Sequence, residues 1–193
     1  MKQKILEEFR KTICVVHPLN DAEWELLSEN VLVKQLKKNE MVHKAGENIS
    51  NFVFLVDGAI RLYFIHNDKE LTHQVYTNQR FIIDLISLKA QEPTLFYMEA
   101  LAESWIIEIS AEFINKLLSL SPTYEKMARV MYENAMFEEM YRVKELLSYT
   151  PFEHYSQFMS RNKELASQMT QTKIARCLNI APETLSRFKQ ITQ

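Results

Sequence analysis

The stretch TQTKIARCLNIAPETLSRFK, residues Thr170–Lys189, has the pattern of two short helices joined by a tight turn. Thr170 suits the N-cap of the first helix, because its hydroxyl can accept a hydrogen bond from a free amide of the first turn. Asn179 stands where the chain must turn, and Asn tolerates the left-handed backbone conformation better than most residues. Pro182 suits the first position of the second helix, where its missing N–H would be unpaired anyway. The stretch therefore predicts a helix-turn-helix.

The second of these helices has one apolar and one polar face. Leu185 and Phe188 face inward at i and i+3. The outer side carries Glu183, Thr184, Ser186, Arg187 and Lys189. Such side chains can reach base edges in a major groove: Arg reads guanine, Glu reads cytosine, and Ser or Thr read several bases. The alternative is an ordinary helical hairpin with a solvated charged face.

Charge is distributed unevenly along the chain. Residues 161–193 contain six Lys and Arg residues against two acids, a net charge of +4. The whole chain carries −2, so the first 160 residues carry −6. A basic end on an acidic body is the pattern expected for a contact with nucleic acid.

The composition describes a globular chain with room for one good core or two small domains. Of its 193 residues, 47% are hydrophobic and 25% are charged. No apolar run approaches membrane-spanning length, and the charged N-terminus does not resemble a signal peptide, so we expect a cytoplasmic protein without a membrane partner. Cys14 and Cys177 stand far apart and belong to no ligand-spaced cluster, which favours small buried side chains in a reducing compartment.

The central part of the chain has the period-two pattern of strands, beginning at Val31. Asp57-Gly58 predicts a two-residue hairpin, and Asn67-Asp68 predicts another turn. Further strands are expected at Leu71–Tyr76 and at Met98–Ile109. Several short strands with turns at regular spacing indicate a small antiparallel barrel or roll.

Helices are expected on both sides of the roll. Residues 1–30 have helical spacing, with a capping box at Asn20 and Glu23. Ser121-Pro122 starts a long helix to about Leu147 that is apolar on two sides, so we expect it to cover its own roll and to pair with a second subunit. The alternative is a single central helix of a monomer. A capping box at Thr150–Glu153 begins a new helix, and this break is the best domain boundary.

Together, the roll, the long helix and the helix-turn-helix resemble the Crp/Fnr family of bacterial transcription regulators. The resemblance rests on three passages: 39–61 with the first roll strands, Phe81–Leu85 with the start of a phosphate-binding cassette, and Lys173–Arg187 with the DNA-reading motif. It implies an α+β fold with an antiparallel β-roll of the cyclic-nucleotide-binding, jelly-roll type. The expected parts are a roll domain with N-terminal helices at 1–120, a dimerisation helix at 121–148, and a winged-helix or helix-turn-helix domain at 149–193.

The resemblance also implies a homodimer that binds a near-palindromic site on double-stranded DNA. By this likeness Glu183 and Arg187 should read base edges, with Ser186 beside them. Thr170, Gln171 and Lys173 should hold phosphates at the first helix. Thr184 and Lys189 complete the expected DNA-binding set.

The cassette departs from that of the family members that bind cyclic AMP. Those members have Gly-Glu-Leu, followed about ten residues later by an Arg that neutralises the phosphate. Here Ile83 and Asp84 replace the Gly and the Glu, the Arg position falls at Pro93 or Thr94, and no basic residue lies between Lys89 and Glu108. A buried cyclic phosphate would have no counter-charge, so we expect a neutral or apolar pocket that takes another small-molecule effector, if any. The expected lining includes Phe81, Ile83, Asp84, Leu85 and Thr94.

Other site types find less support in the sequence. Two isolated cysteines cannot hold an iron–sulfur cluster. Haem remains an alternative, since there are five His residues. A cupin-like metalloenzyme needs clustered His ligands, and no His-x-His occurs. A further alternative is a ligand-binding roll whose last helices only dimerise. We predict no catalytic residues, no metal ligands and no cofactor, and hence a protein that is not an enzyme.

Overall fold

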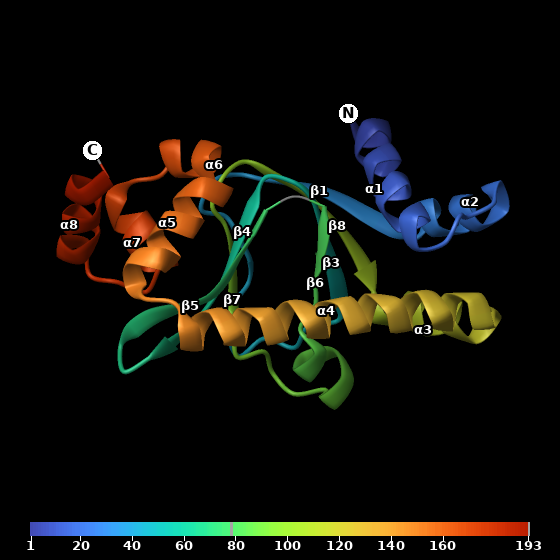
Figure 1. Cartoon of the computed structure of the whole chain (residues 1–193). Coiled ribbons are helices and arrows are strands. Elements are labelled where there is room, and N and C mark those ends of the chain that lie inside the picture. Colours follow the sequence, from blue (N-terminus) through green and yellow to red (C-terminus); the bar gives the residue numbers. More distant parts are fainter. Residues whose placement is uncertain (78, 193) are drawn as a thin grey trace.

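The structure is a computed structural model that describes residues 1–77 and 79–192 (Figure 1). Two N-terminal helices precede a β-roll, a long helix crosses the molecule, and short helices form the C-terminal end. The helices are α1 (Lys2–Val16), α2 (Asp21–Glu29), α3 (Ala111–Leu120), α4 (Pro122–Ser148), α5 (Pro151–Arg161), α6 (Lys163–Ser167), α7 (Gln171–Cys177) and α8 (Pro182–Thr192), with one π-helical turn, η1 (Ile86–Ala90).

The described strands form two antiparallel four-stranded sheets. They are β1 (Val31–Leu36), β2 (Met41–His43), β3 (Asn51–Asp57), β4 (Ala59–His66), β5 (Lys69–Thr77), β6 (Arg80–Ile82), β7 (Tyr97–Ala100) and β8 (Ser104–Ser110). The first sheet has the order β1-β8-β3-β6, and the second has the order β2-β7-β4-β5. The predicted α+β fold with an antiparallel roll is therefore confirmed.

Local signals placed several elements correctly. Asn20 and Glu23 form the predicted capping box of α2, and Thr150 and Glu153 form that of α5. The α4 helix begins at Pro122, as its Ser-Pro signal predicts. Asn67 and Asp68 both have positive φ angles, 49° and 59°, between the paired ends of β4 and β5, which is the geometry of a two-residue hairpin.

The predicted hairpin at Asp57-Gly58 is wrong. The strands on either side, β3 and β4, belong to different sheets, so the dipeptide is a corner at which the chain changes sheets. Gly58 has φ 101°, and a Cβ built there would lie 2.7 Å from the carbonyl oxygen of Glu103. Hairpins and corners both need a residue with positive φ, so the Asp-Gly signal cannot distinguish them.

The single strand expected at Met98–Ile109 is two strands. The chain bends after Ala100 and resumes at Ser104, which places β7 and β8 in different sheets. Leu101, within the bend, is only 1% exposed. Because Leu101 is as buried as the strand residues beside it, the hydrophobic pattern does not mark the point at which the strand breaks.

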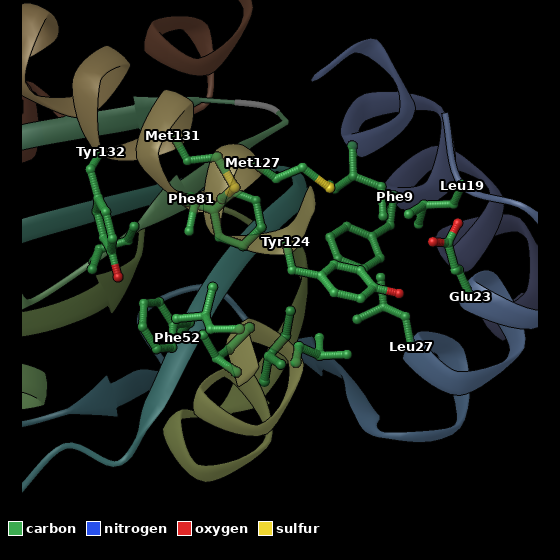
Figure 2. A pocket seen from close by; sticks show the side chains of 17 residues that line it. Phe9, Leu19, Glu23, Leu27, Phe52, Phe81, Tyr124, Met127, Met131 and Tyr132 are labelled. Carbon is green, nitrogen blue, oxygen red and sulfur yellow. The ribbon is translucent and has the colours of Figure 1, made fainter. Parts of the chain in front are cut away.

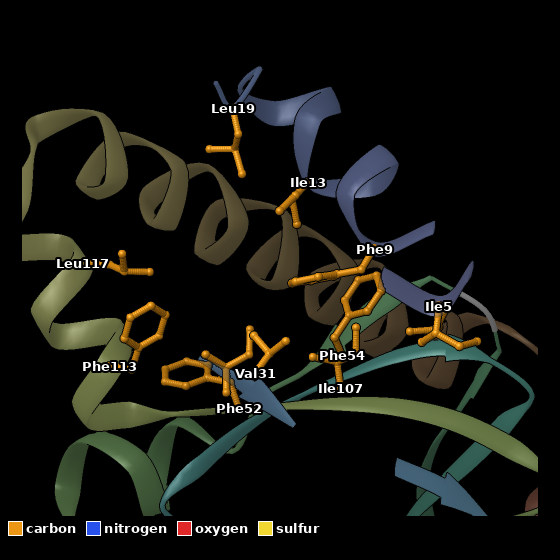
Figure 3. Packing of buried hydrophobic residues seen from close by; sticks show 12 residues of the cluster. Ile5, Phe9, Ile13, Leu19, Val31, Phe52, Phe54, Ile107, Phe113 and Leu117 are labelled. Atoms are coloured by element: carbon orange, nitrogen blue, oxygen red, sulfur yellow. The ribbon is translucent and has the colours of Figure 1, made fainter. Parts of the chain in front are cut away.

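The roll has two apolar layers. Between the sheets lies a core that includes Leu55, Ile60 and Ile106, each 0% exposed. The outer face of the sheet β1-β8-β3-β6 carries a second core, built by Phe54 and Ile107 with Phe9 from α1 (Figure 3). The α1, α3 and α4 helices cover this outer face.

The C-terminal part of the described chain is helical. After α4 come α5 to α8, and no strand that could form a wing lies in this part of the described residues. No described helix is long and apolar enough to cross a membrane.

Candidate nucleic-acid interface

The α7 and α8 helices form the predicted helix-turn-helix. Thr170 caps α7, because its Oγ1 accepts a hydrogen bond of 3.2 Å from the amide of Lys173. Asn179 has φ 55°, in the left-handed region. The following amide, of Ile180, donates to the carbonyl of Ala175 at 3.0 Å and closes the turn. The sequence signals in this stretch therefore fold locally as expected.

The α8 helix is fixed by its inner face. Leu185 is 0% exposed at the centre of the C-terminal core. The ring of Phe188 lies 5.2 Å from that of Phe152 and 5.6 Å from that of Tyr155, both on α5. This packing fixes the rotation of α8 about its axis and thereby decides which side chains face outward.

The outer face of α8 holds the predicted base-reading residues. Glu183, Ser186 and Arg187 are exposed, while Thr184 and Lys189 are half-buried. Of the residues expected to hold phosphates, Thr170 and Gln171 are exposed and Lys173 is half-buried. Exposure of Glu183 and Arg187 is a condition that base reading requires.

The α7 helix and the turn after it dock on the roll, at the edge strand β5. The amide of Thr72 donates to Oδ1 of Asn179 at 2.7 Å, and Nδ2 of Asn179 donates to the carbonyl of Thr72 at 2.8 Å. The Thr72 hydroxyl donates to the carbonyl of Arg176 at 2.7 Å. The Asn179 side chain thus pairs with a strand edge that would otherwise present unsatisfied backbone groups.

Charged residues also join α7 to the roll. Lys173 pairs with Glu99 of β7, and the two side chains are only 18% and 9% exposed. Arg61 of β4, 0% exposed, donates through Nη1 to Glu70 at 2.7 Å and lies 3.6 Å from Glu99. Arg176 lies 3.5 Å from Glu70. We call these groups the docking network: Arg61, Glu70, Thr72, Glu99, Lys173, Arg176 and Asn179.

Opposite charges compensate one another within the docking network. Burial alone would raise the pKa of Glu70, but the hydrogen bond and the charge of Arg61 outweigh it and lower this pKa below its usual value. The guanidinium of Arg61 also lies over the ring of Tyr63, 4.2 Å from its centroid. Glu70 and Glu99 therefore lie between cations of the roll and cations of α7.

Sequence reasoning did not find Arg61, Glu70 or Glu99. One signal was available: Arg61 interrupts an apolar strand between Ile60 and Leu62. The partner of Arg61 depends on the register of the strands, because that register places Arg61 of β4 opposite Glu99 of β7. That register depends on the fold and is not visible in the local sequence.

The expected effector residues do not gather in one place. Phe81 and Ile83 line an apolar cavity that α4 also lines. Asp84 instead accepts hydrogen bonds from the Thr94 hydroxyl and, at 3.1 Å, from the amide of Ser87. Leu85 is 43% exposed. The carboxylate of the cassette is therefore hydrogen-bonded to nearby residues of the chain, and of the cassette residues only Phe81 and Ile83 line the cavity.

The cassette lacks the glycine and the arginine that the resemblance implies for holding a cyclic phosphate. Its acid, Asp84, bonds to Thr94, which stands at or beside the position where a phosphate-binding Arg is expected. One cation on each of β6 and α4 already has an acidic partner: Arg80 lies 3.2 Å from Glu138, and Arg142 donates to Glu139 at 2.8 Å. A buried cyclic phosphate would find no unpaired cation among these groups.

The described residues offer no metal site, because no group of three or more His, Cys, Asp or Glu side chains is placed to hold an ion. Cys177 is 8% exposed on α7, and burial raises the pKa of its thiol to about 11. A thiol with such a pKa is a poor nucleophile at neutral pH.

The comparisons with known proteins agree with this architecture. Residues 33–121 match the cyclic nucleotide-binding domain. No curated protein sequence matches the chain. A proposed transcriptional regulator of the Crp/Fnr family from Eubacterium rectale aligns with a TM-score of 0.72 and 16% identity, over 94% of this chain and 87% of that one.

Two further solved structures have similar folds. The c-di-GMP-responsive global regulator CLP of Xanthomonas campestris aligns with a TM-score of 0.67 and 12% identity, over 87% of this chain and 89% of that one. The catabolite activator protein of Thermus thermophilus aligns with a TM-score of 0.56 and 15% identity, over 93% and 85%. At these identities the likeness establishes a shared fold.

Proposed function

Because this chain is a Crp/Fnr-like protein in its fold, with a cyclic nucleotide-binding domain at residues 33–121, we propose that it is a homodimeric transcription regulator that binds DNA sequence-specifically. The observation that carries the proposal is the outer face of α8. Glu183, Ser186 and Arg187 are exposed there, while Leu185 on the opposite side is fully buried. The helix thus presents side chains that can read base edges.

Each residue has a distinct role in this proposal. Glu183 and Arg187 read bases one helical turn apart, and Ser186 lies beside them. Thr170 and Gln171 contact phosphate at the start of α7, together with Lys173 once it is available. Thr184 and Lys189 support the contact from the flanks of α8. The proposed DNA-binding part is 149–193, joined through the helix at 121–148 to the roll domain at 1–120.

Lys173 requires a change of partner before it can hold phosphate. Its ammonium is bound to Glu99, inside the docking network. We infer that the described arrangement is a docked form and that binding to DNA releases α7 from β5 and β7. The phosphate then replaces the Glu99 carboxylate as the anion beside Lys173.

The second half of α4 supports the proposed dimer. Its exposed apolar side chains are Met136, Phe137, Met140, Tyr141, Val143, Leu146 and Leu147. Leu147 is 84% exposed, and Met140 is 63% exposed. A contiguous apolar face of this kind is expected to pair, and a two-fold copy of the same helix is the simplest complement. Such a dimer would place two α8 helices about 34 Å apart, one turn of DNA.

We further propose that the regulator responds to an effector other than a cyclic nucleotide. Three interactions support a ligand without a cyclic phosphate. Arg80 and Arg142 each have an acidic partner, and Asp84 is bonded to Thr94. Calorimetry with cyclic AMP and cyclic GMP tests it, and micromolar binding of either would contradict it.

Selection of binding sites from random double-stranded DNA tests the main proposal. We expect enrichment of a near-palindromic motif with half-sites about 10 base pairs apart. A second candidate function is a dimerising roll whose last helices never bind DNA. The burial of Lys173 against Glu99 favours this candidate, and a selection that enriches no motif would support it.

A further inference from the structure

A cavity of about 90 Å³ lies on the outer face of the sheet β1-β8-β3-β6 (Figure 2). The sheet contributes Phe52 and Phe81, and α1 and α2 contribute Phe9 and Leu27. The α3 helix and the first turns of α4 complete the wall. The cavity is therefore separate from the core between the two sheets, where Leu55 and Ile106 lie.

The wall of the cavity is almost entirely apolar. Of the 17 residues that line it, only Glu23, Tyr124 and Tyr132 have polar side-chain groups, and none is Lys, Arg or His. Figure 2 shows the Glu23 carboxylate and the Tyr124 hydroxyl on the same side of the cavity. Burial and the charge of Glu23 raise the pKa of Tyr124, which is consistent with that proximity. The cavity thus has an apolar body and one end that carries a carboxylate and a phenol hydroxyl.

An apolar gap of this kind favours an apolar occupant. Atoms that line a void lack contact partners on one side, and a ligand of matching character restores those contacts. Water is a poor occupant, because it needs two to four polar partners. Met127 and Met131 also line the cavity, and unbranched thioether side chains adjust readily to the shape of a ligand.

We propose that this cavity is the effector site and that it binds a small neutral aliphatic molecule with a hydroxyl at one end. The inference rests on the proposed response to an effector. An apolar cavity of roughly 150 Å³ accommodates benzene, so the smaller volume here favours a short chain with fewer heavy atoms than benzene. The Glu23 carboxylate can accept a hydrogen bond from a hydroxyl and repels a carboxylate, so alcohols are favoured over fatty acids.

The position of the cavity links its ligand to the dimer helix. Tyr124 and Met131 lie in the first half of α4, whose second half carries the exposed apolar face with Met140. On the other side, Phe9 and Leu27 belong to the N-terminal helices. A bound chain would therefore connect α1 and α2 to the helix through which the roll reaches the DNA-binding part.

Calorimetry on the full chain without DNA tests the proposal, with 1-butanol and butanoate as probes of equal chain length. We expect 1-butanol to bind once per protomer, and butanoate to bind about tenfold more weakly or not at all. Glu23→Gln should bring butanoate to within about threefold of butanol. Gln can replace Glu in the capping box with Asn20, so the fold of α2 is kept.

Cavity-filling variants locate the site. Ala128 lines the cavity on α4, so Ala128→Leu should weaken butanol binding about tenfold or more without lowering the melting temperature, because the added side chain fills the cavity. Ala135→Leu, at an exposed position of the same helix outside this cavity, should bind butanol like the wild type. If Ala128→Leu does not fold, Ile114→Phe on α3 provides the same test.

Three results would overturn the proposal: no butanol binding by the wild type, equal affinity of the wild type for butanol and butanoate, or butanol binding that survives the filling variants. All of these measurements use the free protein. A failure therefore leaves the proposed DNA binding untouched, and a failure to bind DNA leaves the cavity assignment untouched.

Discussion

Lys173 of the helix-turn-helix and Glu99 of the roll form an ion pair that is largely withdrawn from solvent, with side chains 18% and 9% exposed. The pair joins the residue expected to hold a DNA phosphate to a carboxylate on strand β7 of the roll. Glu99 also lies 3.6 Å from the fully buried Arg61. One acid thus connects the two parts of the chain, and its replacement gives a direct test of docking.

Replacing Glu99 with Gln should release α7 from the roll. Removing one partner of a buried ion pair costs about 3–5 kcal/mol, and here Lys173 can avoid that cost by moving into solvent. We expect Glu99→Gln to raise the affinity for DNA of any sequence by about tenfold, measured by fluorescence anisotropy at fixed salt, because more molecules are competent to bind.

Glu108→Gln is the matched control for that prediction. Glu108 is a similarly buried acid of the roll, but it pairs with Lys34 at 2.8 Å and lies outside the docking network. The Glu108→Gln substitution should leave the affinity for DNA unchanged. Equal effects of the two substitutions would show that roll stability, and not docking, sets the affinity.

Cys177 should report on docking through its reactivity. Burial raises the pKa of its thiol to about 11, so that about one molecule in a thousand is ionised at pH 8. In a Cys14→Ser background we expect slow labelling by a thiol reagent, accelerated about tenfold or more by Glu99→Gln. A rate equal to that of the unfolded chain in both proteins would contradict the docked arrangement.

His43 should make the fold sensitive to mild acid. It is 7% exposed, its Nε2 has no hydrogen-bond partner in the described structure, and burial lowers its pKa despite the nearby carboxylates of Asp84, Glu47 and Glu108. The unfolded chain therefore binds a proton at this position more readily than the folded chain. We expect the free energy of unfolding to fall as the pH drops below about 6.5.

His43→Leu tests this pH dependence. The variant should lose less stability than the wild type between pH 7.5 and pH 5.5, measured by urea unfolding at several values of pH. His73, whose pKa burial also lowers, keeps part of the slope in the variant. Parallel curves for His43→Leu and the wild type would show that His43 does not contribute.

The α4 helix should lose its partner when a charge enters its apolar face. Met140 is 63% exposed, and a two-fold interface contains it twice. We expect Met140→Glu to weaken the dimer by about 100-fold in sedimentation equilibrium, because two carboxylates would be buried or brought together. Lys126→Glu, at an exposed position in the first half of α4, should leave the dimer intact.

Local chemistry made much of this fold predictable. Capping boxes at Asn20 and Thr150, the left-handed Asn179 and the Ser-Pro start of α4 each depend on a few neighbouring residues, and each was found in place. The corner at Gly58 was misread because hairpins and corners share the same backbone requirement. Choosing between them depends on which sheet each strand joins, and that is a property of the whole roll.

Of the candidate site, only the exposed face of α8 could be predicted from the sequence. Exposure of Glu183 and Arg187 follows from the helical spacing of Leu185 and Phe188, which is visible in the sequence. The partner of Lys173 is not visible, because Glu99 lies 74 residues away on another element. Contacts between distant segments require the register of β4 and β7, which the hydrophobic pattern leaves open.

The most direct test of the central claim, that α8 reads DNA bases, is the ratio of affinities for the selected site and for a scrambled site of equal length. Because Lys173→Ala also breaks the docking pair with Glu99, its contribution to phosphate binding is measured in the Glu99→Gln background. There Lys173→Ala should leave the ratio unchanged, weaken binding to both DNAs and lower the salt dependence by about one ion. Arg187→Ala should lose about 1–3 kcal/mol on the selected site and little on the scrambled one, so that its ratio falls. An unchanged ratio for Arg187→Ala would contradict the account.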